Sequence, residues 1–310
     1  MATNFRWRYI AAMKSGSVTI ARATLLIVLS AISFGSISVL TVLITGAGLS
    51  LVAAMAWRFL LGAVMLGAVC NVKSLAKVPR TRVVQLLLIG GSGQALITYV
   101  SLHALDYIGV GPLAFLFYTY PAWVALLAAI RKTERLTPIR VTALAIALIG
   151  VGVMVGAPMT ERLHPFGVFL ALASALIYSA YLPALEYFQK DIPALLTSFL
   201  LISGAAVTFA TISLFTGKLS VPTDVTVWRN IFILALVSTV IAFSALLKGL
   251  AVLGPVRTSI IATVEPFFTA ILGVIVLNNK LTMTTLVGGV LIAIAILTIE
   301  WSATKQEATA

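Results

Sequence analysis

Charged residues are scarce in this chain. Asp, Glu, Lys and Arg make up 10% of its 310 residues, and 61% of the residues are hydrophobic. A soluble domain carries roughly 25% charged residues. A surface of this composition cannot be solvated by water, so lipid must be the solvent of the protein. The composition therefore excludes an ordinary soluble domain and makes the lipid bilayer the first expected partner.

Acidic residues are the scarcer of the two charge classes. The chain has 9 Asp and Glu against 21 Lys and Arg, which gives a net charge of +12. In a soluble protein this excess would point to a nucleic-acid partner. Here the basic residues lie between apolar runs, so we attribute the excess to membrane topology and expect no nucleic-acid partner.

Cysteine and histidine are nearly absent, which limits the available chemistry. The one cysteine, Cys70, cannot form an intrachain disulfide, and His103 and His164 are not paired at helical spacing. A metal site is therefore not expected. The stretch from Gly91 to Gln94 lacks the lysine of a phosphate-binding loop. We expect no cofactor, no ATP-driven step and no enzymatic activity.

Long apolar runs dominate the chain. They predict an all-α integral membrane protein, because each is near the ~20 residues with which a helix crosses the hydrocarbon and is continuously apolar rather than alternating. The ten predicted spans are Thr24–Ile44, Leu51–Val69, Val83–Leu105, Gly109–Ile130, Ile139–Val155, Phe166–Leu185, Ala194–Phe215, Ile231–Leu247, Val252–Leu277 and Leu281–Ile299.

The same unit occurs twice in the chain. The pairs Gly109 and Gly254, Pro121 and Pro266, Ala125 and Ala270, Leu136 and Leu281, and Thr137 and Thr282 are each 145 positions apart. Five spans in each half make the second copy start from the opposite side of the membrane, so the halves are predicted to be inverted repeats, as in many secondary transporters. We expect the two five-helix repeats at 24–157 and 158–300, with tails at 1–23 and 301–310.

Positive charges orient the first half. With the N-terminus inside, its inner segments hold twelve basic residues and its outer loops none, whereas the second half is unbiased. The twelve are Arg6, Arg8, Lys14, Arg22, Lys73, Lys77, Arg80, Arg82, Arg131, Lys132, Arg135 and Arg140. The positive-inside rule then predicts that both termini are cytoplasmic, in a multi-pass protein of the cell's inner membrane.

The residues around the two prolines carry a family resemblance. Tyr120-Pro121 precedes Glu134-Arg135-Leu136-Thr137, and Glu265-Pro266 precedes Asn279-Lys280-Leu281-Thr282. Both stretches resemble the EamA-type repeat of the drug/metabolite transporter superfamily, which ends in a span with a central proline and a polar turn of the form Glu-Arg-Leu-Thr. The second copy departs from that form at Asn279.

This resemblance covers nearly the whole chain, from about Thr24 to Ile299, and includes the Trp57-Arg58-Phe59 stretch of the second span. It implies ten transmembrane helices in two inverted five-helix repeats. It also implies an exporter of small metabolites, similar to the bacterial ten-span amino-acid exporters of the YddG kind.

Two charged residues lie near the middle of predicted spans, Arg58 and Glu265. A charge at the bilayer centre costs about 2.5–3.5 kcal/mol on insertion scales, so such residues face the bundle interior, pair or become neutral. Burial favours the neutral form of Glu265, which allows proton coupling. Glu265 is either a proton carrier or substrate-ammonium ligand, or a hydrogen-bonded packing group. We expect Arg58 to be a structural charge that donates to backbone carbonyls.

The two prolines predict breaks in the helices that contain them. Pro121 and Pro266 each remove a helical hydrogen bond and free a carbonyl one turn earlier, that of Phe117 or Ala262. In transporters such interruptions put backbone groups beside the substrate. A plain kink that lets the helices pack around a cavity is the alternative.

Polar and aromatic side chains recur at helical spacing on several spans. They predict a central cavity for a small-molecule substrate, and ordinary interhelical hydrogen bonding is the alternative for any single residue. The predicted cavity residues are Ser33, Gln94, Thr98, Tyr99, Ser101, Tyr118, Tyr120, Ser174, Tyr178, Tyr181, Phe243, Thr263 and Glu265.

The sequence thus favours a secondary exporter of amino acids or related amphipathic compounds that works by alternating access, as a monomer or homodimer. The family resemblance implies that the first, third, fourth, sixth, eighth and ninth spans surround the cavity, and the polar stripes and prolines independently support all of these except the eighth. An intramembrane enzyme or a lipid-handling protein on a similar bundle is the alternative, and it would need a denser polar site.

Overall fold

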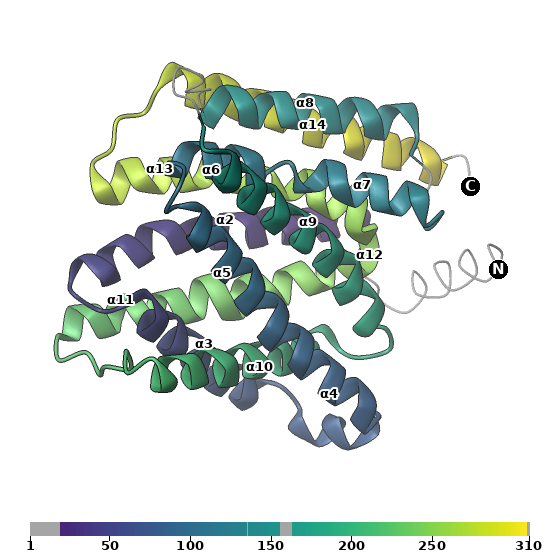
Figure 1. Cartoon of the computed structure of the whole chain (residues 1–310). Helices are drawn as coiled ribbons and strands as arrows, with labels where there is room; N and C mark the ends of the chain where they lie inside the picture. Colours follow the sequence, from purple (N-terminus) through teal and green to yellow (C-terminus); the bar gives the residue numbers. More distant parts are fainter. Residues whose placement is uncertain (1–18, 135, 156–162, 309–310) are drawn as a thin grey trace.

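The computed structural model describes residues 19–134, 136–155 and 163–308, with side chains as far as Trp301. Within these ranges the chain forms helices joined by short connections and no strand (Figure 1). The expected all-α membrane fold is therefore confirmed. The predicted N-terminal tail up to residue 18, Arg135 and the predicted repeat boundary at 157–158 lie outside the described residues.

The first half contains eight helices and one 3₁₀ segment, η1. In chain order they are α2 (Ile20–Gly46), α3 (Leu51–Val69), η1 (Val72–Lys77), α4 (Arg80–Leu88), the π-helix η2 (Ile89–Gly93), α5 (Gln94–Ala104), α6 (Val110–Phe117), α7 (Tyr120–Ile130) and α8 (Pro138–Val155).

The second half follows the same order. It consists of α9 (Pro165–Phe188), α10 (Ala194–Phe215), α11 (Val225–Ala235), the π-helix η3 (Leu236–Ile241), α12 (Ala242–Ala262), α13 (Glu265–Leu277) and α14 (Met283–Ala308). Helix α14 continues past residue 301, where a tail was expected, although its apolar portion ends at Trp301.

Equivalent elements start 145 positions apart. This offset relates the first residues of α2 and α9, of α4 and α11, of α7 and α13, and of α8 and α14. A π-helix interrupts the same helix in each half, at η2 and at η3. The repeat that the sequence indicated through a few prolines and turn residues therefore extends to the starts and interruptions of the helices.

Nine helices of the described chain are long and apolar enough to cross a membrane, one fewer than the ten predicted spans. The difference lies in Val225–Ala262, which is helical over 38 residues and is followed by the shorter apolar helix Glu265–Leu277. At 1.5 Å per residue that stretch is about 57 Å long, nearly twice the ~30 Å of hydrocarbon. Gly254 interrupts it with φ 73° and ψ 169°. The predicted spans Ile231–Leu247 and Val252–Leu277 thus meet at a glycine corner.

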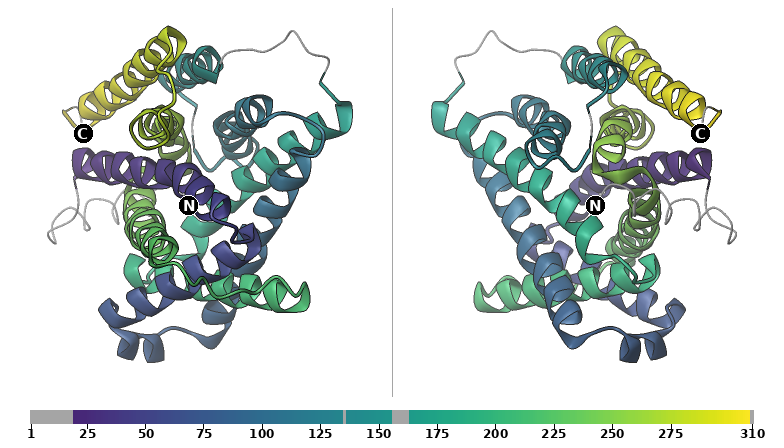
Figure 2. Two further views of the ribbon diagram at one scale, coloured as in Figure 1. Left: turned by 90° about the vertical axis from the view of Figure 1, so that its left-hand side faces the viewer. Right: turned by 90° about the vertical axis from the view of Figure 1, so that its right-hand side faces the viewer.

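Several pairs of packed helices take one helix from each half. Helix α8 lies along its own counterpart α14, and α3 lies along its counterpart α10. Helix α2 packs on α12 and α13, just as α9 packs on α5 and α7 (Figures 1 and 2). This reciprocity is what a two-fold relation between the repeats requires. Helix α2 begins and α14 ends at the same end of the molecule, on the right in Figure 1.

Small residues allow the closest of these contacts. A Cβ at Gly150 of α8 would lie 2.9 Å from the carbonyl oxygen of Gly288, and a Cβ at Gly288 of α14 would meet the carbonyl oxygen of Gly150. Ala143 and Ala295 are fully buried on the same two helices. Glycine and alanine therefore bring α8 and α14 together, as small residues do in membrane helix pairs.

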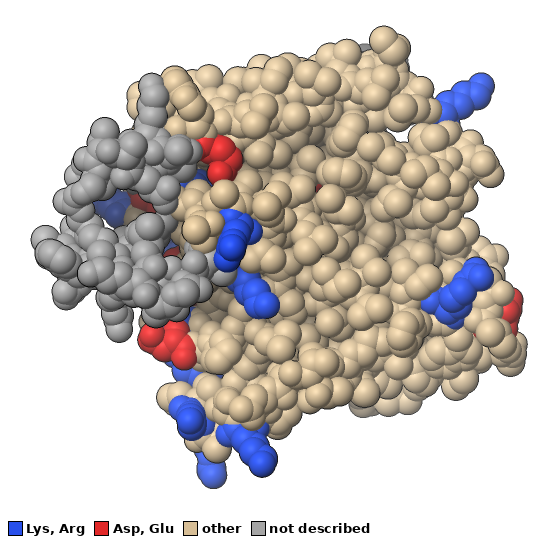
Figure 3. Space-filling model, turned by 180° about the vertical axis from the view of Figure 1, so that it is seen from behind, with Lys and Arg blue, Asp and Glu red and all other residues tan. Residues whose placement is uncertain are grey.

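The outer surface is that of a membrane protein. Figure 3 shows a broad band without prominent charge between two edges where Lys, Arg, Asp and Glu gather. Large apolar side chains are exposed along the spans, among them Leu25 at 67% and Phe169 at 63%. Lipid tails cover such residues at no cost, so their exposure here needs no protein partner.

Candidate functional site

The two proline-containing spans are broken at equivalent places. In the first half α6 ends at Phe117 and α7 begins at Tyr120; in the second, α12 ends at Ala262 and α13 begins at Glu265. Pro121 and Pro266 occupy the first turn of α7 and α13, where the missing N–H has no helical acceptor in any case. The prolines therefore start new helices instead of kinking continuous ones.

Glu265 stands at the break in the second half, beside a group of aromatic rings from the first half and from α9. The hydroxyls of Tyr118, Tyr120 and Tyr178 lie near its carboxylate, and that of Tyr118 is oriented so that it can donate to it. The ring centroids of Tyr120 and Tyr178 are 4.7 Å apart, and those of Phe117 and Tyr178 are 5.5 Å apart. The ring centroids of Tyr178 and Tyr181 are 6.2 Å apart. We call Tyr118, Tyr120, Tyr178 and Tyr181, with Phe117 beside them, the tyrosine cluster.

No basic side chain forms an ion pair with Glu265 among the residues that the structure describes; the ion pairs there are His103 with Asp106 and Arg140 with Glu134. A carboxylate without a cationic partner is costly in a low-dielectric interior. Protonation of the carboxyl group, or binding of a cation beside it, removes this cost. The surroundings of Glu265 therefore suit binding of a proton or of a positively charged group.

Several predicted cavity residues use their hydroxyls within their own helix. The Ser174 hydroxyl donates to the carbonyl of Ala171 at 2.7 Å, and that of Thr263 donates to the carbonyl of Ile260 at 2.7 Å. Ser33 is buried on α2, one residue before Phe34, whose ring meets Phe243 at 5.2 Å. The hydroxyls of Ser174 and Thr263 thus bond within their own helices, whereas the alternative to a cavity was hydrogen bonding between helices.

The predicted residues of α5 differ in their exposure. Gln94, Thr98 and Ser101 are half-buried. Tyr99, by contrast, is 66% exposed and stacks on His103 with centroids 5.7 Å apart. The side chains of Thr98 and Tyr99 point in different directions, because successive residues of a helix are rotated by about 100°. The structure thus separates Tyr99 from the tyrosine cluster.

Arg58 lies away from Glu265, against the π-helix η3. It is 3% exposed. Its Nε donates to the hydroxyl of Thr239 at 2.8 Å, and one terminal nitrogen donates to the carbonyl of Ser238 at 2.8 Å. A π-helix displaces carbonyls from regular helical pairing, so a buried guanidinium with two donors is well suited to satisfy them. Of the two bonds, one goes to a backbone carbonyl, the kind of partner expected for Arg58, and the other to a side-chain hydroxyl.

Sequence reasoning did not assign a role to Glu134, which it used only as a family marker. One carboxylate oxygen of Glu134 accepts from the backbone N–H of Val256 at 3.3 Å, and the other accepts from Arg140 at 2.8 Å. The contact joins residues 122 positions apart. The offset of 145 positions could have drawn attention to Glu134, because the equivalent residue is Asn279 and the two repeats therefore differ there.

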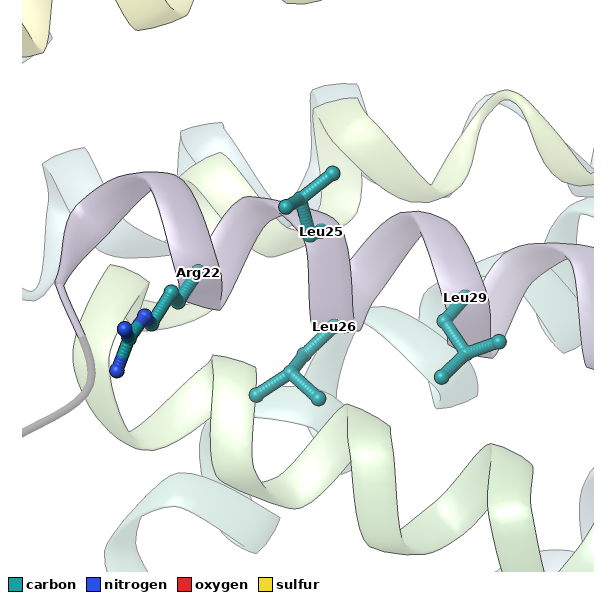
Figure 4. Close-up of a pocket in the computed structure, with 4 residues that line it drawn as sticks. All are labelled: Arg22, Leu25, Leu26 and Leu29. Atoms are coloured by element: carbon teal, nitrogen blue, oxygen red, sulfur yellow. The ribbon is translucent and has the colours of Figure 1, made fainter.

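A shallow groove of about 330 Å³ lies along α2, lined by Arg22, Leu25, Leu26 and Leu29 (Figure 4). Three of the four side chains are leucines, and Arg22 stands at the end of the row. The groove is open and apolar, as expected of a surface that faces lipid tails with a cation at headgroup level. It is distinct from the site at Glu265.

Two repeats that pack reciprocally, with helices broken at equivalent points beside a half-buried carboxyl group, are typical of membrane transporters. The comparison with protein families agrees. The model of the EamA-like transporter family matches residues 21–156 and 165–301, so the chain belongs to this family of membrane transporters. The resemblance read from the prolines and polar turns is thereby confirmed at the level of the family.

One solved structure, described only as "Crystal structure of protein", matches with a TM-score of 0.76 and 19% sequence identity. The match covers 93% of this chain and 99% of that one. At this identity the likeness supports the fold alone. No curated protein matches the chain significantly.

Proposed function

We propose that the protein is a secondary exporter of amino acids or related small amphipathic compounds, and that it works by alternating access of its two inverted halves. The observation that carries this proposal is Glu265, a carboxyl group without a basic partner among the described residues, at a helix break beside the tyrosine cluster. Exchange of a proton for a positively charged substrate at one carboxyl group would couple the two movements.

The proposed architecture has ten membrane crossings, with both termini on the cytoplasmic side. Gly254 divides the long helical stretch at the position that corresponds to Gly109, which lies in the connection before α6. Dividing the chain there makes an eighth span that ends at Leu253 and a ninth that starts at Pro255. Each half then has five crossings, which is the condition for inverted repeats.

The chemistry of the site favours a substrate with a protonated amine and an apolar body. A carboxylate attracts the ammonium group, and aromatic faces attract a cation within about 6 Å of the ring centroid. The Tyr118 hydroxyl lies near Glu265 and can donate to the same carboxylate. An amino acid or an organic amine meets these requirements.

Counterflow in proteoliposomes tests the proposal. Wild-type protein should exchange labelled substrate from at least one of three classes: amino acids, nucleosides and cationic drugs. Glu265→Gln keeps the shape of the side chain but fixes it as neutral, so this variant should fold and fail to exchange substrate at every pH. Glu186→Gln, which changes a partly buried carboxyl near the end of α9, is the matched control and should retain exchange.

Two results would contradict the proposal. Wild-type rates for purified Glu265→Gln across several pH values would show that the carboxyl need not ionise, and Glu265 would then be a packing group beside Pro266. Absence of counterflow by the wild-type protein for all three substrate classes would reject an exporter of such compounds.

A further inference from the structure

The two halves are joined at one end of the molecule by the side chain of Glu134. This residue follows α7 in the first half, and its carboxylate accepts from the N–H of Val256, in the first turn after the corner at Gly254. Gly254 has φ 73°, which favours glycine, and a Cβ there would stand 3.1 Å from a Glu134 carboxylate oxygen. The corner therefore lets the carboxylate approach the start of the helical segment Pro255–Ala262.

The contact is reinforced on both sides. Arg140 donates to the second oxygen of Glu134 at 2.8 Å, and both side chains are only 17% exposed. A carboxylate at a helix N-terminus is stabilised by the free N–H groups and by the helix dipole. Further along the same segment, the hydroxyl of Tyr120 reaches the carbonyl of Ser259 at 3.5 Å. The first half thus holds this segment at its start and near its middle.

The opposite end of the molecule has no such acid. By the offset of 145, Asn279 takes the place of Glu134 and Thr285 takes the place of Arg140. The N–H of Asn279 bonds to the carbonyl of Gly273, at the end of its own helix α13, and Thr285 bonds to the hydroxyl of Thr282. Among the residues that the structure describes, the hydrogen bond from a backbone N–H of one half to a carboxylate of the other is therefore present at Glu134 and not at the equivalent Asn279.

We propose that Glu134 is a latch that holds the half-helix Pro255–Ala262 against the first half and so keeps that end of the transport pathway closed. The proposal rests on the proposed alternating-access function. The segment leads directly to the break at Thr263 and Val264 and then to Glu265. Occupation of Glu265 can thus act on the latched segment through one short helix, and release of Glu134 opens the pathway at that end.

The test compares labelling rates at two equivalent positions in the full chain. Cysteine is introduced by Ser259→Cys, in the latched segment, or by Ala114→Cys, which lies 145 positions earlier in α6. Both are placed in a Cys70→Ser background, which removes the only natural thiol. The purified protein is then treated with a small water-soluble thiol reagent, with Glu134 intact or changed to Ala.

Loss of a charge-assisted contact should shift the balance between the states by about tenfold. With Glu134→Ala we therefore expect labelling at position 259 to rise by about that factor and labelling at position 114 to fall, because opening one end closes the other. Glu134→Gln, whose amide oxygen can still accept from Val256, should cause a smaller change in the same direction. Asn279→Ala is the matched control and should change neither rate.

A rise at both positions would mean general loosening, and unchanged labelling at position 259 would mean that Glu134 does not restrain the segment; either result overturns the latch. If Glu134→Ala does not fold, the Glu134→Gln variant decides by the same criteria. The labelling needs no substrate, so it tests the latch separately from the proposed function. If the wild-type protein shows no counterflow but the labelling rates change as expected, the exporter proposal is rejected and the latch is retained.

Discussion

Replacing Arg58 should reveal whether this residue stabilises the protein through its charge alone or through the two hydrogen bonds that it donates at once. In the structure it holds both the Thr239 hydroxyl and the Ser238 carbonyl, each at 2.8 Å. Hydrogen bonds from a charged donor contribute about 1.5–3 kcal/mol each, so the two together contribute about 3–6 kcal/mol. Burying the guanidinium costs about 2.5–3.5 kcal/mol. The net stabilisation by Arg58 is therefore about 0–3 kcal/mol, less than the two hydrogen bonds alone contribute.

This balance predicts an unusual order for two variants. Arg58→Met loses both hydrogen bonds but also removes the cost of the buried charge, so it should lose about 0–3 kcal/mol. Arg58→Lys keeps a charge in the same place and can reach only one of the two acceptors. It should lose about 1.5–3 kcal/mol with no compensation. We therefore expect Lys, the conservative replacement, to be at least as destabilising as Met.

The apparent Tm of detergent-purified protein, measured at one scan rate for all variants because unfolding of such proteins is often irreversible, checks this order. Arg22→Met, at an exposed position at the start of α2, is the control and should stay within about 0.5 kcal/mol of wild type. A wild-type Tm for Arg58→Lys together with a strongly lowered Tm for Arg58→Met would refute the reasoning, since the charge alone would then be sufficient.

Three further results are expected. Gly204→Ala should sharply reduce the folded yield seen by size-exclusion chromatography, because the added Cβ would fall on the backbone carbonyl of Leu87, which cannot move aside; a normal yield would contradict this. Burial raises the pKa of the Cys70 thiol, so alkylation at pH 7 should be slower than that of a free thiol and should increase as the pH rises; equal rates at pH 7 would be inconsistent with it. Cysteines placed at positions 2 and 308 should be protected from an impermeant reagent outside intact cells, and efficient labelling of either would reject the proposed topology.

Much of the fold could be predicted because it depends on local composition and on repetition. Apolar runs located the helices, and the offset of 145 positions located the breaks at Pro121 and Pro266. The eighth span was predicted to end at Leu247, where the apolar run meets Lys248, whereas the helix continues to Leu253 with Lys248 exposed on its surface. A long side chain can reach the membrane surface from such a position, so its charge does not mark the helix end.

The two π-helices could not be predicted, because they depend on contacts between distant segments. In η2, a Cβ at Gly90 would meet the backbone of Leu201, and one at Gly91 would lie 2.8 Å from the carbonyl oxygen of Gly204. The main chains of η2 and α10 thus touch directly. In η3 it is the side chain of Arg58 that approaches. The positions of Gly90 and Gly91, or of Ser238 and Thr239, in the sequence do not indicate which distant segment they contact.

Sequence analysis identified Glu265 and the aromatic residues around it, but not the contact between the two halves at Glu134. Glu265 and the tyrosines of α7 and α9 were identified because polar and aromatic residues are conspicuous in apolar spans. Glu134 was read as part of a loop motif, and its partner Val256 contributes only a backbone N–H, which no sequence pattern distinguishes. Interactions that use the main chain of one half and a side chain of the other become visible only once the halves are packed together.

The differences between the repeats bear directly on the proposed transport cycle. If the halves were identical, the two-fold relation would give the inward-open and outward-open states equal free energies. A pair that differs, such as Glu134 with Asn279, can contribute to one state and not to the other. Every ~1.4 kcal/mol of such difference shifts the populations tenfold. A single charge-assisted contact at Glu134 is therefore large enough to set the resting state, yet small enough for a substrate at Glu265 to reverse it.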